Sequence, residues 1–150
     1  MNPSDAAIVY GVSVEGAWAY PRFGIGLAQY NVSAKSIAGN CFLFNRTEFS
    51  VVATQRVVQY AVYSVPAGYY IYSPFNTAHL ASSTEAFEAP AGAVVYAGDF
   101  VLTAHGNVAI RRNLASAKQA IQTRYPSLAA RLSQAATVPA EAPRPFLCAP

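Results

Sequence analysis

The chain has 150 residues, of which 53% are apolar and 11% are charged, and its formal net charge is +3. A chain of this length is expected to fold as one domain that buries roughly two thirds of its unfolded surface. The apolar content excludes intrinsic disorder, and the apolar stretches are too short for a membrane-spanning helix. A surface with few charges is typical of secreted domains, virion proteins and subunits of assemblies. We therefore expect protein partners or a homo-oligomer, and no specific nucleic acid.

The first five residues, Met1 to Asp5, lack the positive and apolar regions of a secretory signal. Without a signal peptide, the protein would stay in the cytosol or inside a virion. A mature form whose signal peptide has been removed would instead belong to the bacterial envelope, the periplasm or a virion, and the sequence leaves both localisations open.

Alternating apolar residues predict two long strands near the start, Ala6 to Val14 and Arg22 to Asn31. Gly24 and Gly26 share one face of the second strand. Two glycines on one face indicate that another group packs close to that backbone, or that the strand bends there.

The apolar run Cys41 to Phe44 predicts a short buried strand within Ile37 to Asn45. Further runs rich in β-branched and aromatic residues predict strands at Phe49 to Ala53, Val57 to Val65, Tyr69 to Tyr72, Thr84 to Ala89, Ala93 to Thr103 and Asn107 to Arg111. Gly98 is expected to mark a bulge or bend in its strand. About eight short strands at this spacing predict an antiparallel β-sandwich.

One short phrase occurs twice, as Pro66-Ala67-Gly68 and as Pro90-Ala91-Gly92. Pro at the second position and Gly at the fourth position of a turn suit a type I geometry. Each copy leads directly into an aromatic, β-branched run. The phrases therefore predict two consecutive hairpins, the first of which would pair Val57 to Val65 with Tyr69 to Tyr72.

A helix is predicted to follow Asn113, which is a good N-cap residue. Apolar residues then recur at intervals of three or four, at Leu114, Ala117, Ile121, Tyr125, Leu128 and Leu132. Pro126 should divide or kink this helix because a proline inside a helix removes a hydrogen bond. We expect the apolar stripe to cover an open face or an end of the sandwich.

Residues 1–135 form the predicted domain, and residues 136–150 form a Pro-rich extended tail. Phe146 to Cys148 would dock this tail. Cys41 and Cys148 are a candidate disulfide, which would stabilise the fold by on the order of 4 kcal/mol in the entropic model. Two separate buried thiols are the alternative, and the spacing excludes a local metal or redox motif.

Basic residues gather in the C-terminal part, where residues 106–150 hold six basic and one acidic side chain. The candidates for a basic surface are Arg111, Arg112, Lys118, Arg124 and Arg131. They could contact an anionic membrane surface, nucleic acid or an acidic partner. The alternative is an ordinary solvated helix face.

No motif in the chain predicts a metal site, a phosphate loop or a dinucleotide fold, so we expect no cofactor and no catalytic residues. A further alternative is a hydrolase with a Ser-His-Asp arrangement, formed by His105, Asp99 and either Ser82 or Ser83. No nucleophile elbow supports it.

Ten tyrosines in 150 residues suggest a ligand-binding surface, because tyrosine offers amphipathic contact area at low entropy cost. Tyr69, Tyr70 and Tyr72 are the candidates. Tyr70 and Tyr72 share one face of their strand, and the sequence does not decide which face is buried.

The segment Ala89 to Phe100, followed by the helix from Leu114 to Pro126, resembles a loose group of small bacterial envelope and lipoprotein-like domains. In these domains a Pro-Ala-Gly turn opens a strand reading Val-x-Tyr-x-Gly, and an Ala-rich helix ends near Tyr-Pro. The resemblance covers residues 57–132 and implies no catalytic residues. This chain lacks the lipobox cysteine of the lipoproteins.

These observations together predict a non-enzymatic structural or accessory protein-interaction module. It would be a subunit of a bacterial envelope or virion-like assembly. The alternative is a small-ligand or glycan-binding module that uses exposed tyrosines.

Overall fold

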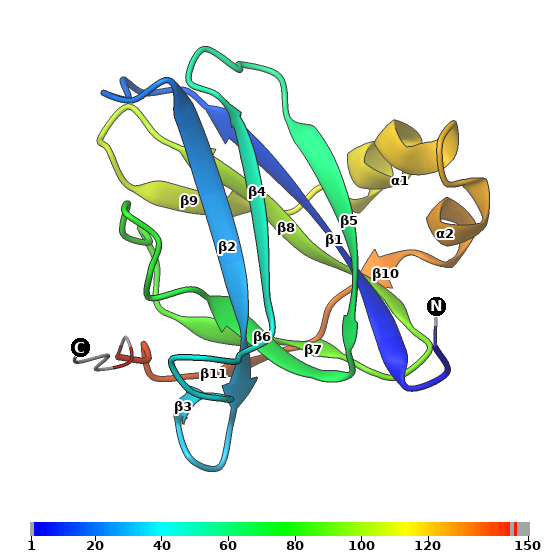
Figure 1. The fold of residues 1–150 in the computed structure, drawn as a ribbon. Coiled ribbons are helices and arrows are strands. Elements are labelled where there is room, and N and C mark those ends of the chain that lie inside the picture. The colour runs from blue at the N-terminus through cyan, green and yellow to red at the C-terminus, as the bar shows by residue number, and fades with distance from the viewer. Residues whose placement is uncertain (1, 145, 147–150) are drawn as a thin grey trace.

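The computed structural model describes residues 2–144 and 146. In this part of the chain two β-sheets pack face to face, and two helices lie against one of them (Figure 1). The fold is mainly β and sandwich-like, which confirms the fold class predicted from the sequence.

The first sheet runs in the order β10 (Ser133–Gln134), β8 (Val94–Leu102), β1 (Asp5–Val14) and β5 (Gln59–Pro66), with β9 (Val108–Arg111) also paired to β8. The second sheet runs in the order β11 (Thr137–Pro139), β7 (Glu85–Ala89), β6 (Gly68–Tyr72), β2 (Arg22–Asn31) and β3 (Ser36–Ile37), with β4 (Arg46–Val52) also paired to β2. Most strand pairs are antiparallel. Strand β8, however, lies parallel to both β1 and β10.

The two Pro-Ala-Gly phrases do not form hairpins, and that prediction is wrong. Strand β5 pairs with β1 in the first sheet, whereas β6 pairs with β2 and β7 in the second. The second phrase likewise carries the chain from β7 in the second sheet back to β8 in the first. Each phrase is a crossover between the sheets, at the same end of the sandwich.

The start of β1 lies between the two crossovers. Ala67 donates its N–H to the Ser4 carbonyl (3.2 Å), and Gly92 donates its N–H to the Asp5 carbonyl (2.7 Å). Strands β1 and β8 therefore leave from the same end of the molecule, which is why they are parallel.

The second phrase also differs in turn type from the prediction. The turn is closed by a hydrogen bond from the Ala93 N–H to the Pro90 carbonyl (3.0 Å), so Gly92 is its third residue. Gly92 has a φ of +76°. A positive φ at the third position is the requirement of a type II turn, not of type I.

The centre of the sandwich is built around Tyr10, whose side chain is fully buried. Its ring packs against the rings of Phe100 (5.7 Å between centroids) and Tyr63 (6.0 Å). Its hydroxyl donates to the Ile25 carbonyl (3.0 Å) and lies 3.0 Å from the Thr47 hydroxyl. The two sheets are thus joined by aromatic packing and by a satisfied polar group at one position.

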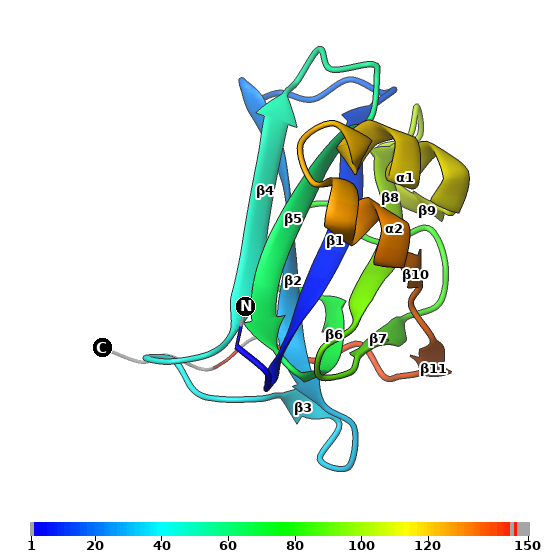
Figure 2. The ribbon, with the colours of Figure 1, turned by 90° about the vertical axis from the view of Figure 1, so that its right-hand side faces the viewer.

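The helical prediction is confirmed in detail. Helix α1 (Leu114–Gln122) is capped by the Asn113 side chain, which accepts from the Ser116 N–H (3.1 Å). Helix α2 (Pro126–Arg131) begins at Pro126, so the proline separates two helices. Their apolar stripe covers the outer face of the first sheet (Figure 2).

Residues Cys41 to Phe44 do not form the predicted buried strand. They lie in an irregular loop between β3 and β4, where Phe42 is 97% exposed and Leu43 is 77% exposed. The predicted bulge at Gly98 is confirmed, because the register of β1 against β8 shifts between Tyr96 and Gly98.

The C-terminal segment contributes to both sheets before it leaves them. Strand β10 adds to β8, and β11 adds to β7 at the edge of the second sheet. Further on, the Phe146 ring packs against Phe44 (5.3 Å between centroids) and Phe75 (6.2 Å). Cys148 lies outside the described residues, so the predicted disulfide with Cys41 stays a prediction.

Candidate functional site

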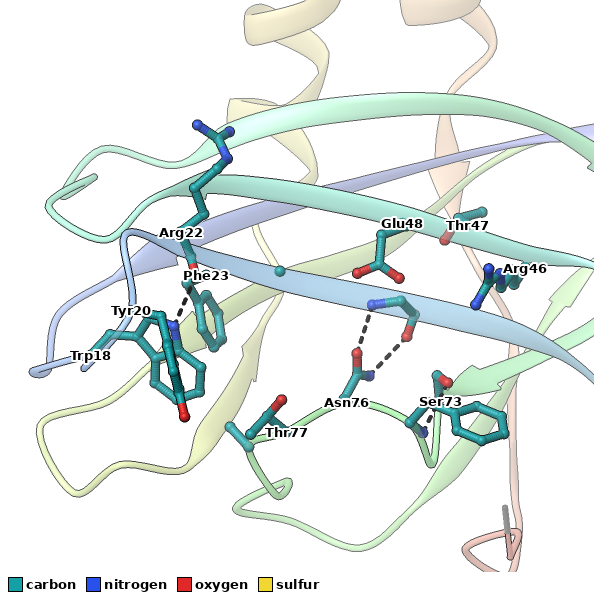
Figure 3. Close-up of a pocket in the computed structure, with 14 residues that line it drawn as sticks. Trp18, Tyr20, Arg22, Phe23, Arg46, Thr47, Glu48, Ser73, Asn76 and Thr77 are labelled. Atoms are coloured by element: carbon teal, nitrogen blue, oxygen red, sulfur yellow. Dashed lines mark hydrogen bonds between the residues drawn. The ribbon is translucent and has the colours of Figure 1, made fainter. Parts of the chain in front are cut away.

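A groove opens beside β2, where the neighbouring strand β6 has already ended. After Tyr72 the chain leaves the sheet as the polar loop 73–83, and the first half of β2 has a sheet neighbour on one side only, β4. A cavity of about 200 Å³ lies there (Figure 3). Its lining residues include Trp18, Tyr20, Gly24, Gly26, Glu48, Asn76 and Thr77.

Two side chains cap the free edge of β2. Trp18 donates its Nε1–H to the Arg22 carbonyl (2.8 Å). Asn76 accepts a hydrogen bond from the Gly26 N–H (2.8 Å) and donates one to the Gly26 carbonyl (2.9 Å), as the dashed lines in Figure 3 show. The Ser73 N–H also donates to the Gly26 carbonyl (3.0 Å).

Gly24 lies between these two capped residues on the same edge. In an antiparallel strand the N–H and C=O of alternate residues point to opposite sides. The backbone N–H and C=O of Gly24 therefore point in the same direction as those of Arg22 and Gly26, which is away from β4 and toward the groove. Among the described residues, neither backbone group of Gly24 has a hydrogen-bond partner.

The glycine pair explains how the Glu48 carboxylate reaches the sheet surface. A Cβ added to Gly24 would lie 3.3 Å from Glu48 Oε1, and one added to Gly26 would lie 3.2 Å from Oε2. The prediction that another group packs close to these glycines is confirmed. Within the described residues no cation pairs with this carboxylate, so it remains an acceptor at the rim of the groove.

Aromatic rings form one end of the groove. The Trp18 ring packs edge-on against Phe23 (5.1 Å between centroids) and against Tyr20 (5.9 Å). Figure 3 shows Trp18 and Tyr20 on one side of the cavity and Asn76 on the other, with Thr77 opposite β2. The indole is fixed by its hydrogen bond to β2, whereas Tyr20 is 64% exposed.

An apolar surface adjoins the groove at Phe75, which lines the cavity. The Phe75 ring packs against Phe44 (5.8 Å), and the Arg46 guanidinium lies 5.2 Å from the Phe44 ring centroid. Phe42 and Leu43, immediately before Phe44, are the most exposed large apolar side chains among the described residues.

Residues 40–44, which we call the apolar loop, are held in a defined shape. The Asn40 side chain accepts from the N–H groups of Phe42 (2.9 Å) and Leu43 (3.1 Å). The Asn40 N–H in turn donates to the Leu43 carbonyl (3.0 Å). Gly39 precedes the loop with a φ of +114°, a conformation that favours glycine.

A buried polar cluster lies on the outer face of the first sheet, next to α1. Asp99 accepts hydrogen bonds from the hydroxyls of Tyr96 (2.6 Å) and Tyr60 (3.1 Å) and is 6% exposed. Burial raises the pKa of Asp99 above its usual value, and the two hydroxyl donors oppose this rise. Burial, with the nearby Asp99, raises the pKa of both tyrosines.

This cluster does not form the Ser-His-Asp arrangement that was the hydrolase alternative, because in the described part of the chain His105 is not joined to Asp99. His105 lies in the exposed loop between β8 and β9, and its backbone N–H donates to the Thr103 hydroxyl (3.2 Å). Within the described residues no hydrogen bond joins His105 to Asp99. The tyrosine donors make Asp99 part of the packing between β5, β8 and α1.

The structure places two of the three predicted ligand-binding tyrosines in the core. Tyr70 is fully buried and donates to the Pro66 carbonyl (2.7 Å), while Tyr72 is 8% exposed and donates to the Ala78 carbonyl (2.6 Å). Tyr69 faces the opposite side of β6 and is half-buried against the outer cluster of the second sheet. These residues therefore do not form a joint binding surface.

The predicted basic residues make different contacts. Arg111 forms a two-point ion pair with Glu15 (2.5 and 3.0 Å), and Arg131 donates to the Gly92 carbonyl. The Arg124 guanidinium lies over the neighbouring Tyr125 ring (5.6 Å). Arg112 and Lys118 lie near and on α1, so their contact with an anionic surface stays a prediction.

Sequence reasoning did not select Trp18, Glu48 or Asn76 as site residues. Trp18 and Asn76 lie in loops far apart in the sequence, and only the fold brings them to the same strand edge. The glycine pair was the one signal of this site in the sequence.

Among the described residues, no helix is long and apolar enough to cross a membrane, and no group of His, Cys, Asp and Glu is placed to hold a metal ion. No protein-family model, curated protein or solved structure matches the chain.

Proposed function

We propose that the chain is a non-enzymatic protein-interaction module that binds its partner through the apolar loop. One observation carries the proposal. Phe42 and Leu43 are 97% and 77% exposed, yet their backbone is held by hydrogen bonds to Asn40. Exposing two adjacent large apolar side chains in a fixed shape costs free energy that a partner would recover on binding.

The surroundings of the loop support this proposal. Phe44 anchors it through contacts with Phe75 and Phe146, so the exposed tip projects from an aromatic base. Arg46 lies at the edge of the same surface. Aromatic residues and arginine are enriched at the centres of protein interfaces, while lysine and glutamate are depleted there.

We further propose that the partner belongs to an assembly, such as a bacterial envelope or virion-like particle. Charged residues make up only 11% of the chain, so its surface carries few charges. Such a surface is typical of a subunit that covers part of its surface with neighbours. The resemblance of residues 57–132 to bacterial envelope domains supports the proposal that this assembly belongs to the bacterial envelope.

Site-specific photo-crosslinking tests the proposal. A photoreactive residue would replace Phe42 in one variant and Val57 in the other, in cells that naturally express the chain. Val57 is the matched control, since it is apolar and 74% exposed but follows β4 elsewhere on the surface. A discrete adduct from position 42, absent from position 57, is expected. Equal labelling from both positions, or none from position 42, overturns the proposal.

Self-association is measured separately. If the partner is a second copy, sedimentation velocity shows an oligomer that a double variant, Phe42→Ser with Leu43→Ser, converts to a monomer. The Val57→Ser variant should keep the oligomer. An oligomer that survives the double substitution would place the interface elsewhere.

A further inference from the structure

The groove beside β2 contains an unfilled hydrogen-bonding position that is separate from the apolar loop. Its donor is the Gly24 N–H and its acceptor is the Gly24 carbonyl, both on the edge that faces away from β4. These groups lie between the capped carbonyl of Arg22 and the two capped backbone groups of Gly26, and within the described residues they have no partner.

The length of this free edge limits what can bind. Addition of a peptide strand to a sheet edge requires a run of free N–H and C=O groups along the strand. Trp18 already occupies the carbonyl of Arg22, and Asn76 occupies both backbone groups of Gly26. Among the described residues of this edge, Gly24 is the one at which both backbone groups are free, and the occupied Arg22 carbonyl separates it from the rest of the edge, so the site suits a single compact group and not a peptide strand.

Asn76 shows which chemical group fits such a position. Its carboxamide presents an oxygen and an N–H on one planar edge, and these bond to the N–H and the carbonyl of Gly26 at 2.8 and 2.9 Å. Gly24 presents the same donor and acceptor two residues earlier on the same edge.

We propose that the groove binds the planar amide edge of a small aromatic ligand, with the amide paired to Gly24 as Asn76 is paired to Gly26. The aromatic part of the ligand would lie against the rings of Trp18 and Tyr20, which line the same cavity. The Thr77 hydroxyl and the Glu48 carboxylate supply further polar contacts at the rim. This combination of apolar rings with a few placed polar groups is usual in small-molecule sites.

A set of four probes tests the geometry. Benzamide carries a primary carboxamide on a ring, and uracil carries the same donor and acceptor in a cyclic amide. Acetophenone lacks the N–H. N-methylbenzamide has an N–H, but in its trans form this points away from the oxygen. Backbone amide NMR should show the Gly24 resonance moving in a saturable way with benzamide or uracil. The probe that binds with the higher affinity shows whether the site prefers a primary carboxamide or a cyclic amide.

Two outcomes overturn the proposal. One is a Gly24 amide that moves with neither benzamide nor uracil. The other is an equal response to benzamide, acetophenone and N-methylbenzamide, which would show that only the ring is bound.

A pair of variants locates the binding. Tyr20→Ala removes an exposed ring of the groove and should weaken benzamide binding about fivefold, since an aromatic contact of this kind contributes about 1 kcal/mol. Val57→Ala, at an exposed apolar position outside the groove, should leave it unchanged. Equal affinity of Tyr20→Ala and the native chain would overturn the placement of the ligand ring.

Discussion

The side chain of Asn76 pairs with the backbone of Gly26 as a neighbouring strand would. It accepts from the Gly26 N–H at 2.8 Å and donates to the Gly26 carbonyl at 2.9 Å. Strand β6 has ended at Tyr72, so this one amide continues the hydrogen bonding of the sheet past the end of the strand. It also fixes the loop 73–83 against β2 and thereby forms one wall of the groove.

Replacing Asn76 by Ala should therefore loosen this loop and lower stability. The substitution leaves the part-buried backbone groups of Gly26 with fewer partners, so we expect a loss of about 1–3 kcal/mol in the free energy of unfolding. Urea denaturation measures that loss, and hydrogen exchange of the Gly26 amide should accelerate. Unchanged exchange at Gly26 would contradict this account of the pair.

Two glycines should respond differently to substitution because different physical constraints act on them. A Cβ added to Gly11 would lie 2.7 Å from Asp99 Oδ1 and would also collide with the Val58 side chain. A Cβ added to Gly92 would meet no atom within 4 Å, but Gly92 has a φ of +76°. Overpacking limits the first position and backbone conformation limits the second.

Alanine at either position should cost about 1–3 kcal/mol, so asparagine separates the two causes. Asparagine tolerates positive φ, so Gly92→Asn should be more stable than Gly92→Ala. Gly11→Asn should be less stable than Gly11→Ala, because the larger side chain increases the collision. Thermal unfolding of the four variants measures both differences, and the same order at both positions would show that one constraint acts at both.

The sequence predicts the long elements well because their signals are local and repeated. The bounds of β2 agree with the prediction, and those of β1 differ by one residue, since alternation persists over the whole strand. The helices agree because their boundary signals are local: the Asn113 side chain caps α1, and Pro126 is the first residue of α2.

The predictions that failed have two causes, strand pairing between distant residues and a local side chain that competes with the strand. The Pro-Ala-Gly phrases encode a change of direction, but strand pairing decides which sheet the next strand joins. The apolar run Cys41 to Phe44 lies in a loop because Asn40 satisfies its backbone locally. The groove was indicated only by Gly24 and Gly26, and its remaining walls come from loops that tertiary packing positions.

The buried carboxylate of Asp99 should make stability depend on pH in the acid range. Burial raises its pKa in the folded state above the value of 3.8 expected in the unfolded chain. The unfolded state then loses this proton first as the pH rises. The contribution of Asp99 to stability is therefore greatest below pH 3.8, and it falls as the pH rises through the folded-state pKa.

Asp99→Asn removes this dependence while keeping a planar hydrogen-bonding group beside Tyr60 and Tyr96. The free energy of unfolding of the variant minus that of the native chain should increase as the pH rises from below 3.8 toward neutrality, because only the native chain loses stability in this range. Urea denaturation across this range measures the difference. A difference that is constant with pH would show that Asp99 has the same pKa in both states.

The buried tyrosines should make the protein unfold in alkali. Burial raises the pKa of Tyr10 and Tyr72 in the folded state, and it raises that of Tyr70 to about 12. Since the ordinary value is 10.0, the unfolded chain loses these protons first as the pH rises. The stability that the neutral tyrosines supply is present below pH 10 and is lost above it.

The tyrosinate absorbance that comes from the buried tyrosines should therefore rise together with the loss of the native circular dichroism, in one cooperative step above pH 10. The Tyr72→Phe variant removes one ionisable hydroxyl and its hydrogen bond to the Ala78 carbonyl. It should lower the free energy of unfolding at neutral pH by about 1 kcal/mol and reduce the steepness of the alkaline dependence by up to one proton. Tyrosinate absorbance that rises fully while the dichroism stays native would show that these hydroxyls ionise without unfolding.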